Sequence, residues 1–324
     1  MVRNGMNDPN NGFLYGGHAS DQVALIKKAS KDNPKEFIFV RATSSTVLET
    51  ARKAHKLKLV KPILVGEREA IEKSANSIGW SLKDIDIIAT SDEEDAISSS
   101  VNLFKSGNIS GFVKGNLHTD TFMGGLVKRE AGVRVGRRLV HVFVMLPPNG
   151  GEPLLISDAA INIRPDINTR VEAALLMAEM SRKLGCTRPK VAVLSATESI
   201  LPAMPSSVEA VEIARLAREK DPDADFFGPL SFDLAISPTA TAEKGITNQV
   251  AGKANALVVP DIVSGNILFK SLVWCAGGLA AGLVLGGAVP IVLTSRSDPP
   301  EARLAAIALA SLARNFSIKC NKYV

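Results

Sequence analysis

Residues 258–301 read VVPDIVSGNILFKSLVWCAGGLAAGLVLGGAVPIVLTSRSDPPE, and this stretch decides the fold class. An apolar run ends at Asp261, and a polar turn at 264–266 leads into a helix-like segment. A second apolar run, 290–293, ends in the polar segment 294–298. In both places, polar residues follow a buried strand and precede a helix. Open α/β sheets bind ligands at that edge, and helix N-termini favour anions, so the stretch predicts a ligand site.

Between these two strand ends, the run from Trp274 to Thr294 carries no charged residue. It is long enough to resemble a membrane span, but five glycines and Pro290 interrupt it. We therefore expect a buried helix followed by a buried strand, and no membrane-spanning segment.

Outward from this stretch, short apolar runs alternate with helix-like segments. The expected strands are 36–40, 62–66, 85–89, 109–113, 190–194 and 256–259, and the expected helices are 22–30, 46–55, 67–78, 93–105, 119–129, 166–184, 206–220 and 301–314. Two further runs, 139–146 and 154–157, flank a Pro/Asn/Gly turn that is typical of a hairpin. The alternation predicts an α/β fold with mostly parallel sheets flanked by helices.

Length and composition narrow the class of protein. At 324 residues the chain is long enough for two domains, and residues 1–20 are polar enough to predict a flexible tail without a secretory signal. The net charge of +5 is spread out and aromatics are few, so we expect no nucleic-acid partner. Three dispersed cysteines and four dispersed histidines predict no metal site and a reducing, cytoplasmic compartment.

The turn after the strand at 109–113 is the first candidate site. Signatures of nucleotide hydrolysis, serine esterases and zinc hydrolases are missing from the sequence. Lys114, Asn116, His118 and Thr119 lie in one turn, where Gly115 allows backbone to approach a ligand. An ordinary turn with Thr119 as helix cap is the competing interpretation.

The turn after the strand at 290–293 is the second candidate. Asp298, followed by two prolines and Glu301, is typical of a helix start. Arg296 has no such structural role, and its planar guanidinium suits phosphate or a developing oxyanion. Ser295 beside it supplies one more hydrogen bond.

Other strand-end turns add candidate binding residues. They are Asn162 in the segment 158–166, and Asp261, Gly265, Asn266 and Lys270 after the strand at 256–259. Turns and helix caps are the alternative for most of them, and for Lys270 it is a side chain whose stem packs on apolar surface while its ammonium stays in water. The turn at 228–233 contributes Asp233, which is also explained as a first-turn acid.

Taken in order, five motifs resemble the phosphate acetyl/butyryltransferase family. They are VKGNLHT at 113–119, SDAAIN at 157–162, GPLSFD at 228–233, VPD with SGN at 259–266, and PIVLTSR at 290–296. The resemblance covers about residue 36 to the C-terminus and implies the reaction acyl-CoA plus phosphate gives acyl phosphate plus CoA. It implies that Ser295 and Arg296 hold the acyl carbonyl and phosphate, with the turn at 114–119 facing them.

The resemblance also implies an architecture. We expect the two-domain fold of isocitrate and isopropylmalate dehydrogenases, with the active cleft between domains and a homodimer. Domain I takes 21–157 plus 290–324, and domain II takes 158–289. Coenzyme A thioester, phosphate and acyl phosphate enter as substrates, with no tightly bound cofactor.

One departure from the family concerns the thiol base. The acetyltransferase branch has an Asp seven residues after the Ser, where this chain has Ala302. Asp298 and Glu301 are the nearby acids, and the SRxD and VKGNLHT motifs look more like the butyryltransferase branch. Acetyl, propionyl and butyryl chains all remain open. The rival hypotheses are a non-catalytic acyl-CoA-sensing and dimerisation domain, as fused to some malic enzymes, and a two-domain dehydrogenase of the related fold.

Overall fold

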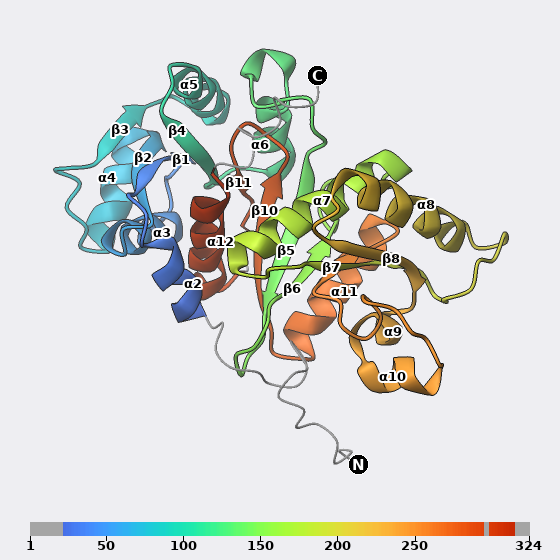
Figure 1. Ribbon diagram of the computed structural model, residues 1–324. Helices are drawn as coiled ribbons and strands as arrows, with labels where there is room; N and C mark the ends of the chain where they lie inside the picture. The colour runs from blue at the N-terminus through green and yellow to red at the C-terminus, as the bar shows by residue number, and fades with distance from the viewer. Residues whose placement is uncertain (1–21, 295–297, 315–324) are drawn as a thin grey trace. The chain divides into compact units, whose positions relative to one another are not determined.

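The computed structural model describes residues 22–294 and 298–314, which form two compact units (Figure 1). We call residues 140–281, with which residues 22–24 are grouped, the continuous unit, and residues 25–139 with the segment from Gly282 onward the split unit. The predicted division into 21–157 with 290–324, and 158–289, stays a prediction. The compact units place the hairpin 140–157 with the residues that follow it, because its second strand pairs with the strand at 256–258.

The sheet of the split unit has the order β3-β2-β1-β4-β11-β10. All neighbours are parallel except β10 and β11, which run antiparallel. The strands are β1 (Lys35–Val40), β2 (Val60–Gly66), β3 (Asp86–Ala89), β4 (Ile109–Lys114), β10 (Leu279–Leu285) and β11 (Ile291–Val292). Parallel alternation confirms the predicted α/β class, since each parallel connection needs a crossover helix.

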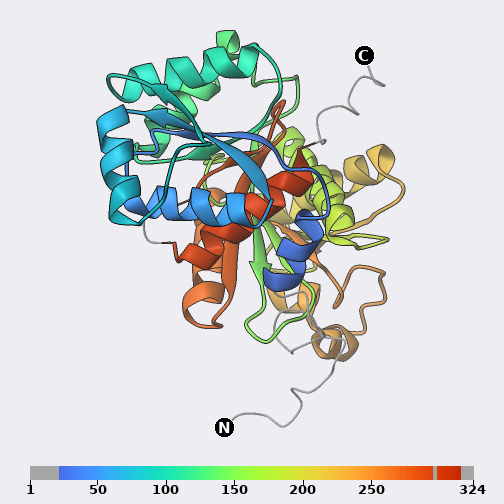
Figure 2. The same ribbon diagram turned by 90° about the vertical axis from the view of Figure 1, so that its left-hand side faces the viewer.

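Helices cover both faces of this sheet. α3 (Ser45–Lys56) and α12 (Pro300–Ala313) pack side by side on one face, and α5 (Glu93–Lys105) and α6 (Thr119–Leu126) lie together on the other (Figure 2). α4 (Arg68–Ser77) packs against β2 and β3, and a 3-10 turn, η1 (Arg129–Ala131), follows α6. α2 (Gln22–Ala29) precedes β1.

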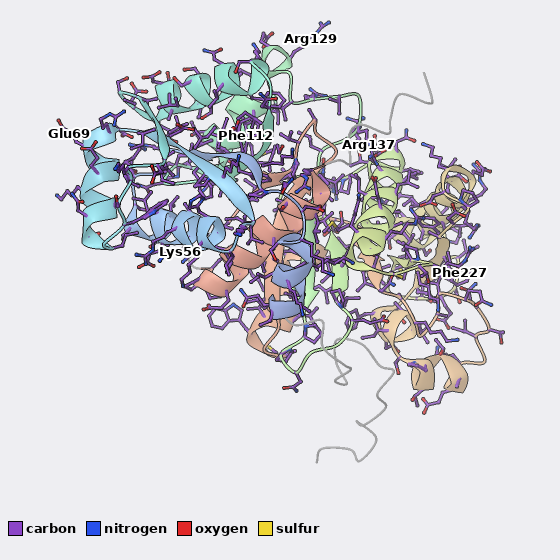
Figure 3. The ribbon with its side chains drawn as sticks, turned by 60° about the vertical axis from the view of Figure 1, so that its left-hand side comes forward. Lys56, Glu69, Phe112, Arg129, Arg137 and Phe227 are labelled. Carbon is purple, nitrogen blue, oxygen red and sulfur yellow. The ribbon has the colours of Figure 1, made fainter. Side chains whose placement is uncertain are left out.

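The core of the split unit follows from its apolar strands. Phe112 of β4 is fully buried and contacts Phe104 with ring centroids 5.4 Å apart. Phe112 lies between the helix layers, whereas the side chains of Lys56, Glu69 and Arg129 project outward (Figure 3). Ser44 caps α3 through a bond from the Val47 amide, so local capping and burial specify the same helix.

In the continuous unit the strands follow the order β5-β6-β9-β7-β8. The β5–β6 hairpin is antiparallel, as predicted, and the other pairs are parallel. The strands are β5 (Val140–Leu146), β6 (Leu154–Ser157), β7 (Lys190–Leu194), β8 (Asp225–Leu230) and β9 (Ala256–Val258).

Five helices belong to the same unit as these strands. α7 (Ile167–Leu184) and α8 (Pro205–Lys220) pack on each other, and the others are α9 (Phe232–Ile236), α10 (Pro238–Glu243) and α11 (Ile262–Trp274). Asp166 caps α7 by accepting the Thr169 amide at 2.7 Å, and Gly185 ends it with φ of 114°. Such a left-handed C-cap favours glycine.

Two expectations for residues 258–301 are wrong. The segment 264–266 is no turn before a helix, because Asp261 caps α11 and places Ser264, Gly265 and Asn266 in its first turns. The segment after Trp274 forms no buried helix but the strand β10, of which five residues are buried. A short, wholly apolar run carries no periodicity that separates helix from strand.

None of the helices in the described part of the chain is both long and apolar enough to cross a membrane.

Candidate functional site

The turn that follows β4 is fixed by the turn that follows β1. The Gly115 amide donates to the Val40 carbonyl and the Asn116 amide to the Arg41 carbonyl, both at 2.9 Å. The Asn116 side chain also donates to the Thr43 hydroxyl at 3.4 Å. Lys114, the last residue of β4, is buried. The structure thus holds Lys114 and Asn116 at the carboxyl edge of the split unit's sheet.

Gly115 is required for this close approach. A Cβ at this position would lie 2.3 Å from the Val40 carbonyl oxygen and 2.5 Å from that of Arg41, which are backbone atoms that cannot rotate away. The sequence predicted the need for glycine here, but attributed it to a ligand. In the structure, the neighbouring turn is what requires it.

Arg41 bonds to residues that follow three different strands, β2, β3 and β4. This residue was not identified from the sequence. Its guanidinium pairs with Glu67 at 3.0 Å and Glu93 at 2.9 Å, and donates to the Asn116 carbonyl at 3.3 Å. Hydrogen bonding to Glu67 raises the pKa of Arg41, against the cost of its burial. Burial would raise the pKa of Glu67, but bonds from Arg41 and from backbone hold it below the ordinary value. Both groups therefore stay charged.

Glu93 connects this network to the candidate turn. Its second oxygen accepts the His118 amide at 3.2 Å. His118 is the N-cap of α6 and Thr119 its first residue, without a side-chain capping bond from His118. The alternative in which Thr119 caps α6 is therefore wrong, because Thr119 already lies inside the helix and His118 holds the cap position.

The second candidate turn begins at the same edge of the same sheet. β11 pairs in parallel with β4, Ile291 opposite Phe112 and Val292 opposite Val113. The chain therefore leaves β11 beside the end of β4, where Lys114 lies. Ser295 and Arg296 lie outside the described residues.

The start of α12 follows the predicted prolines. Asp298 is described, and its carbonyl accepts a bond from Arg303. Pro299, rather than Asp298, is the N-cap of α12. Ala302, where the acetyltransferase branch has an acid, is buried.

In the continuous unit, the candidate loop after β6 is organised by the Asp158 carboxylate. One of its oxygens accepts the amides of Ala160 and Ile161, at 2.9 and 3.0 Å. The other accepts the His141 amide at 3.0 Å, the Asn162 amide at 3.3 Å and the Asn162 side chain at 2.7 Å. Asp158 is only 4% exposed. It therefore sets the conformation of this loop, whereas the sequence reading had singled out Asn162.

The first turns of α11 pack directly on that loop. A Cβ on Gly265 would lie 2.6 Å from the Asp158 carbonyl oxygen, and the Asn266 side chain donates to the Ala159 carbonyl at 3.4 Å. Asp261 accepts the Ser264 amide at 2.8 Å and its hydroxyl at 3.0 Å. The structure thus brings Asn162, Gly265 and Asn266 together, and uses Asp261 as a helix cap.

Lys270 lies further along α11, beside an aromatic stack. Its ammonium is 6.0 Å from the Phe269 ring centroid, and Phe269 stacks on Phe143 at 4.0 Å. Phe143 in turn contacts His141, with centroids 4.4 Å apart. Burial lowers the pKa of His141 to about 4, against the opposing charge of Asp158. This imidazole is therefore neutral at physiological pH.

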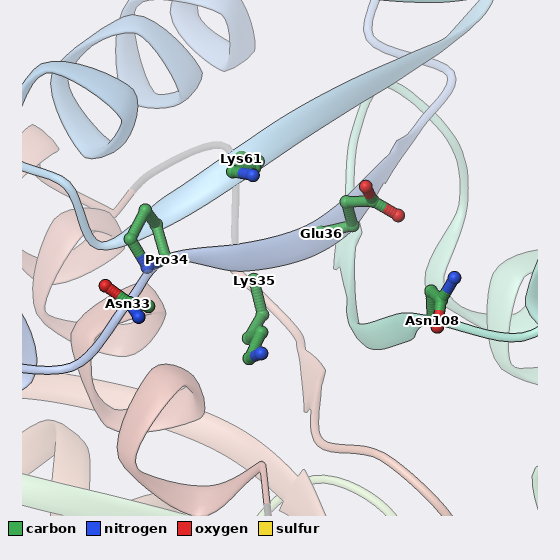
Figure 4. A pocket seen from close by; sticks show the side chains of 6 residues that line it. All are labelled: Asn33, Pro34, Lys35, Glu36, Lys61 and Asn108. Atoms are coloured by element: carbon green, nitrogen blue, oxygen red, sulfur yellow. The ribbon is translucent and has the colours of Figure 1, made fainter.

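A separate hollow of about 450 Å³ lies at the opposite edge of the split unit's sheet (Figure 4). Lys35 and Glu36 of β1, Lys61 of β2 and Asn108, just before β4, line it together with Asn33 and Pro34. These residues stand at the amino ends of the strands. The hollow is therefore distinct from the candidate turns, which follow the carboxyl ends.

Among the residues that the structure describes, no group of three His, Cys, Asp or Glu side chains is arranged to hold a metal ion. The described candidates are instead hydrogen-bond donors and cations. Lys114 and Asn116 in one unit, and Asn162 and Asn266 in the other, lie near the carboxyl ends of parallel strands, and Lys270 lies further along α11. Such groups suit anionic oxygen atoms.

Sequence comparison now identifies the family. The model of the family described as "Phosphate acetyl/butaryl transferase" matches residues 88–311, well over half of the chain. The chain belongs to this family. The match spans both compact units and every candidate turn described above.

Curated relatives of the family cover nearly the whole chain. A phosphate acetyltransferase of Rickettsia felis is 36% identical over 96% of this chain and 89% of its own length. One of Rhizobium meliloti is 38% identical over 89% of this chain and 92% of its own. A phosphate butyryltransferase of Clostridium acetobutylicum is 32% identical over 89% and 96%. Relatives with either activity therefore have similar sequence identity to this chain.

Solved structures of family members share the fold. A branched-chain phosphotransacylase from Enterococcus faecalis has a TM-score of 0.75 and 32% identity, over 86% of this chain and 99% of its own. A 4-hydroxythreonine-4-phosphate dehydrogenase from Burkholderia phymatum has a TM-score of 0.54 at 14% identity, over 87% and 98%. The second likeness concerns the fold alone, and agrees with the predicted relation to two-domain dehydrogenases.

Proposed function

We propose that this protein is a phosphate acyltransferase, which converts acyl-CoA and phosphate to acyl phosphate and CoA by direct transfer in a ternary complex. Membership of the family supports the activity. The main support for the site is the parallel pairing of β4 with β11. Because of this pairing, the turn with Lys114 and the segment with Ser295 and Arg296 begin at the ends of neighbouring strands.

The chemistry requires alignment and positive charge. Phosphate attacks the thioester carbonyl, whose oxygen becomes an oxyanion, and the thiolate then leaves. We propose that the Arg296 guanidinium and the Ser295 hydroxyl bind the carbonyl oxygen and the phosphate. The planar guanidinium presents several N–H donors in a fork, which suits the oxygen atoms of both groups. Lys114 supplies a second positive charge, and Asn116, His118 and Thr119 bind the substrate from the same turn.

The continuous unit supplies the remaining substrate contacts in this proposal. Asn162, Gly265 and Asn266 already form one surface around the loop after β6. Lys270 adds a cation for an anionic substrate such as CoA, and Asp261 contributes by capping α11. No tightly bound cofactor is part of this proposal.

We assign the thiol base to Asp298. Ala302 is buried and carries no titratable group, so it cannot take a proton from CoA. Asp298 precedes α12 by two residues and lies directly beyond the Ser295–Arg296 segment. The base acts in the reverse reaction, in which the CoA thiol attacks acyl phosphate. For that direction, Asp298→Asn is expected to lower kcat at neutral pH and to flatten the acid limb of the pH profile.

The central experiment is Arg296→Ala, assayed by release of free thiol from acyl-CoA with phosphate. Removing one oxyanion donor typically costs about 10²–10³ in kcat. Arg215→Ala is the matched control, because Arg215 is exposed on α8 and pairs with Glu212 and Glu219 of its own helix. Unchanged activity of folded Arg296→Ala would exclude this residue from the mechanism. Saturable acyl-CoA binding by the unmodified chain, without turnover of any acyl group, would favour a sensing domain instead.

The same assay with acetyl, propionyl and butyryl-CoA assigns the acyl chain. One methylene in an apolar pocket discriminates by roughly 1–3 kcal/mol, or about 10- to 200-fold in kcat/KM. The SRxD and VKGNLHT motifs favour the longer chains.

We further propose a cytoplasmic homodimer that uses the outer face of α11. Val263, Ile267 and Trp274 are 61%, 61% and 84% exposed on this helix, which is unusual for large apolar side chains. Trp274→Glu is expected to give monomers in sedimentation velocity. Ile200→Glu, at an exposed apolar position away from α11 (60% exposed), is the control and should leave the assembly unchanged. A monomeric unmodified protein would refute the dimer.

A further inference from the structure

The positive charge of this protein is concentrated in one segment of the split unit. Residues 27–61 contain ten Lys or Arg and three Asp or Glu, so their net charge is +7, whereas the whole chain has +5. The remainder of the chain therefore carries a small negative charge. The expectation that the charge is spread out is wrong for this segment.

The fold brings the lysines of this segment to one edge of the sheet. β1 and β2 begin side by side, with Lys35 opposite Val60, and α3 ends just before β2. Lys35 and Lys61 line the hollow of Figure 4, and Lys56 projects outward in Figure 3. We call the six exposed lysines at this place the basic edge: Lys31, Lys35, Lys53, Lys56, Lys58 and Lys61.

Neighbouring carboxylates do not balance the basic edge. Among the residues that the structure describes, none of its six ammonium groups forms an ion pair. Asp32 is already paired with Arg314 at 2.8 Å, and Glu36, opposite Lys61 in the β1–β2 pairing, makes no pair with it. On α8, by contrast, the exposed Arg215 pairs with two acids of its own helix. Attraction to the dipole at the end of α3 accounts only for the lysines in its last turn.

Lys58 occupies a position at which glycine is the usual residue. The Leu59 amide donates to the Ala54 carbonyl at 3.0 Å and the Lys58 amide to the His55 carbonyl at 2.9 Å, a pair of bonds that ends a helix with a left-handed residue. The φ of Lys58 is accordingly 57°. The same pair of bonds ends α4, α7 and α10, where the left-handed residue is glycine: Gly79, Gly185 and Gly245. Because a side chain is strained in this conformation, the stability of the helix end does not explain a lysine here.

The composition of the basic edge indicates which kind of anion it fits. All six cations are lysines, which act as mobile point charges, whereas bidentate recognition of a single phosphate uses arginine. Within residues 27–61, all of them described, no Phe, Tyr or Trp is exposed for nucleic-acid bases to stack on. Leu57 is 40% exposed and stands between Lys56 and Lys58. An apolar side chain between lysines suits a membrane interface, where ammonium groups meet lipid phosphates and the apolar group enters the headgroup layer.

We propose that the basic edge binds the surface of membranes that contain anionic lipids. The six ammonium groups lie against lipid phosphates, Leu57 enters the headgroup region, and the chain stays on the surface of the bilayer. Each lysine near such a surface strengthens binding about five-fold. The basic edge lies at the amino ends of β1 and β2, so it is separate from the candidate turns at the carboxyl ends, and the proposal does not depend on the acyltransferase activity.

The test is co-sedimentation of the full chain with lipid vesicles. We expect binding to vesicles of phosphatidylglycerol and phosphatidylcholine in equal parts, little binding to phosphatidylcholine alone, and release from the anionic vesicles as salt is raised. Equal binding to both kinds of vesicle would overturn the electrostatic basis of the proposal. Binding to duplex DNA without binding to the anionic vesicles would overturn the choice of a membrane.

Lys58→Gly separates binding from stability, because the two effects have opposite signs. Glycine removes the strain of the left-handed residue, so the urea midpoint should rise, while vesicle partition should fall about five-fold. Lys56→Gln should cause a similar fall in partition. Lys253→Gln is the matched control, since Lys253 is an exposed lysine of the continuous unit, and it should leave partition unchanged. Unchanged partition of Lys58→Gly and Lys56→Gln, or an equal fall for Lys253→Gln, would refute the role of the basic edge.

Discussion

Replacing Asp158 by Asn tests whether one carboxylate holds the loop after β6. Asp158 is buried, and its two oxygens accept five N–H groups, two at one oxygen and three at the other. An amide keeps one oxygen and turns the other into a donor. In either orientation, at least two N–H groups therefore lose their acceptor.

The expected loss of stability follows from the number of N–H groups that lose their acceptor. A buried donor without a partner costs about 1–3 kcal/mol, so Asp158→Asn is expected to lower the free energy of unfolding by about 2–6 kcal/mol. Asp261→Asn is the matched control, since Asp261 follows the neighbouring strand and acts as an N-cap through one oxygen. Asn caps helices nearly as well as Asp, so this variant should lose less than about 0.5 kcal/mol.

Urea denaturation followed by circular dichroism measures both variants, and hydrogen exchange assigns the loss to residues 140–281. Exchange should accelerate in the peptides that contain the loop at 158–163 and the start of α11, because these pack on each other. Equal stability of the two variants would refute the view that Asp158 organises the loop.

Three further substitutions test other parts of the structure. Gly115→Ala places a methyl group 2.3 Å from the Val40 carbonyl, so we expect about 1–3 kcal/mol of destabilisation in urea melts and a marked loss of activity. Arg41→Lys keeps the positive charge but loses the forked N–H donors of the guanidinium. We expect this variant to raise KM several-fold while its far-UV circular dichroism spectrum stays unchanged. The folded pKa of His141, about 4, lies below its ordinary 6.5, so the unfolded chain binds more protons between these values. Stability should therefore fall by about 3 kcal/mol as pH drops from 6.5 to 4, and His141→Phe, which keeps a ring against Phe143, should remove that dependence.

Most of the fold was predictable because its strands and helices differ in length and periodicity. The alternation from residue 36 to residue 129 predicted four parallel strands, and the structure confirms each of them. The prediction failed in the apolar run after Trp274, where a uniform sequence carries no periodic signal. It also placed a turn at 264–266, because Ser, Gly and Asn favour turns unless a cap such as Asp261 starts a helix there.

The candidate site was predictable only in part. The positions of Lys114, Asn116 and Asn266 at strand ends follow from the order of strands and turns. The roles of Arg41, Glu93 and Asp158 do not, because each acts on residues distant in sequence or on several backbone amides at once. An arginine directly after the first strand was the available signal for that network.

The split unit has a consequence for synthesis on the ribosome. Residues 25–139 lack β10, β11 and α12 until the chain beyond Gly282 emerges. At roughly 5–20 residues per second, the intervening segment 140–281 delays these elements by about 7–28 s. During that interval the edge of β4, with the apolar face around Phe112, has no neighbouring strand, so nascent chains are expected to need chaperone protection at that stage.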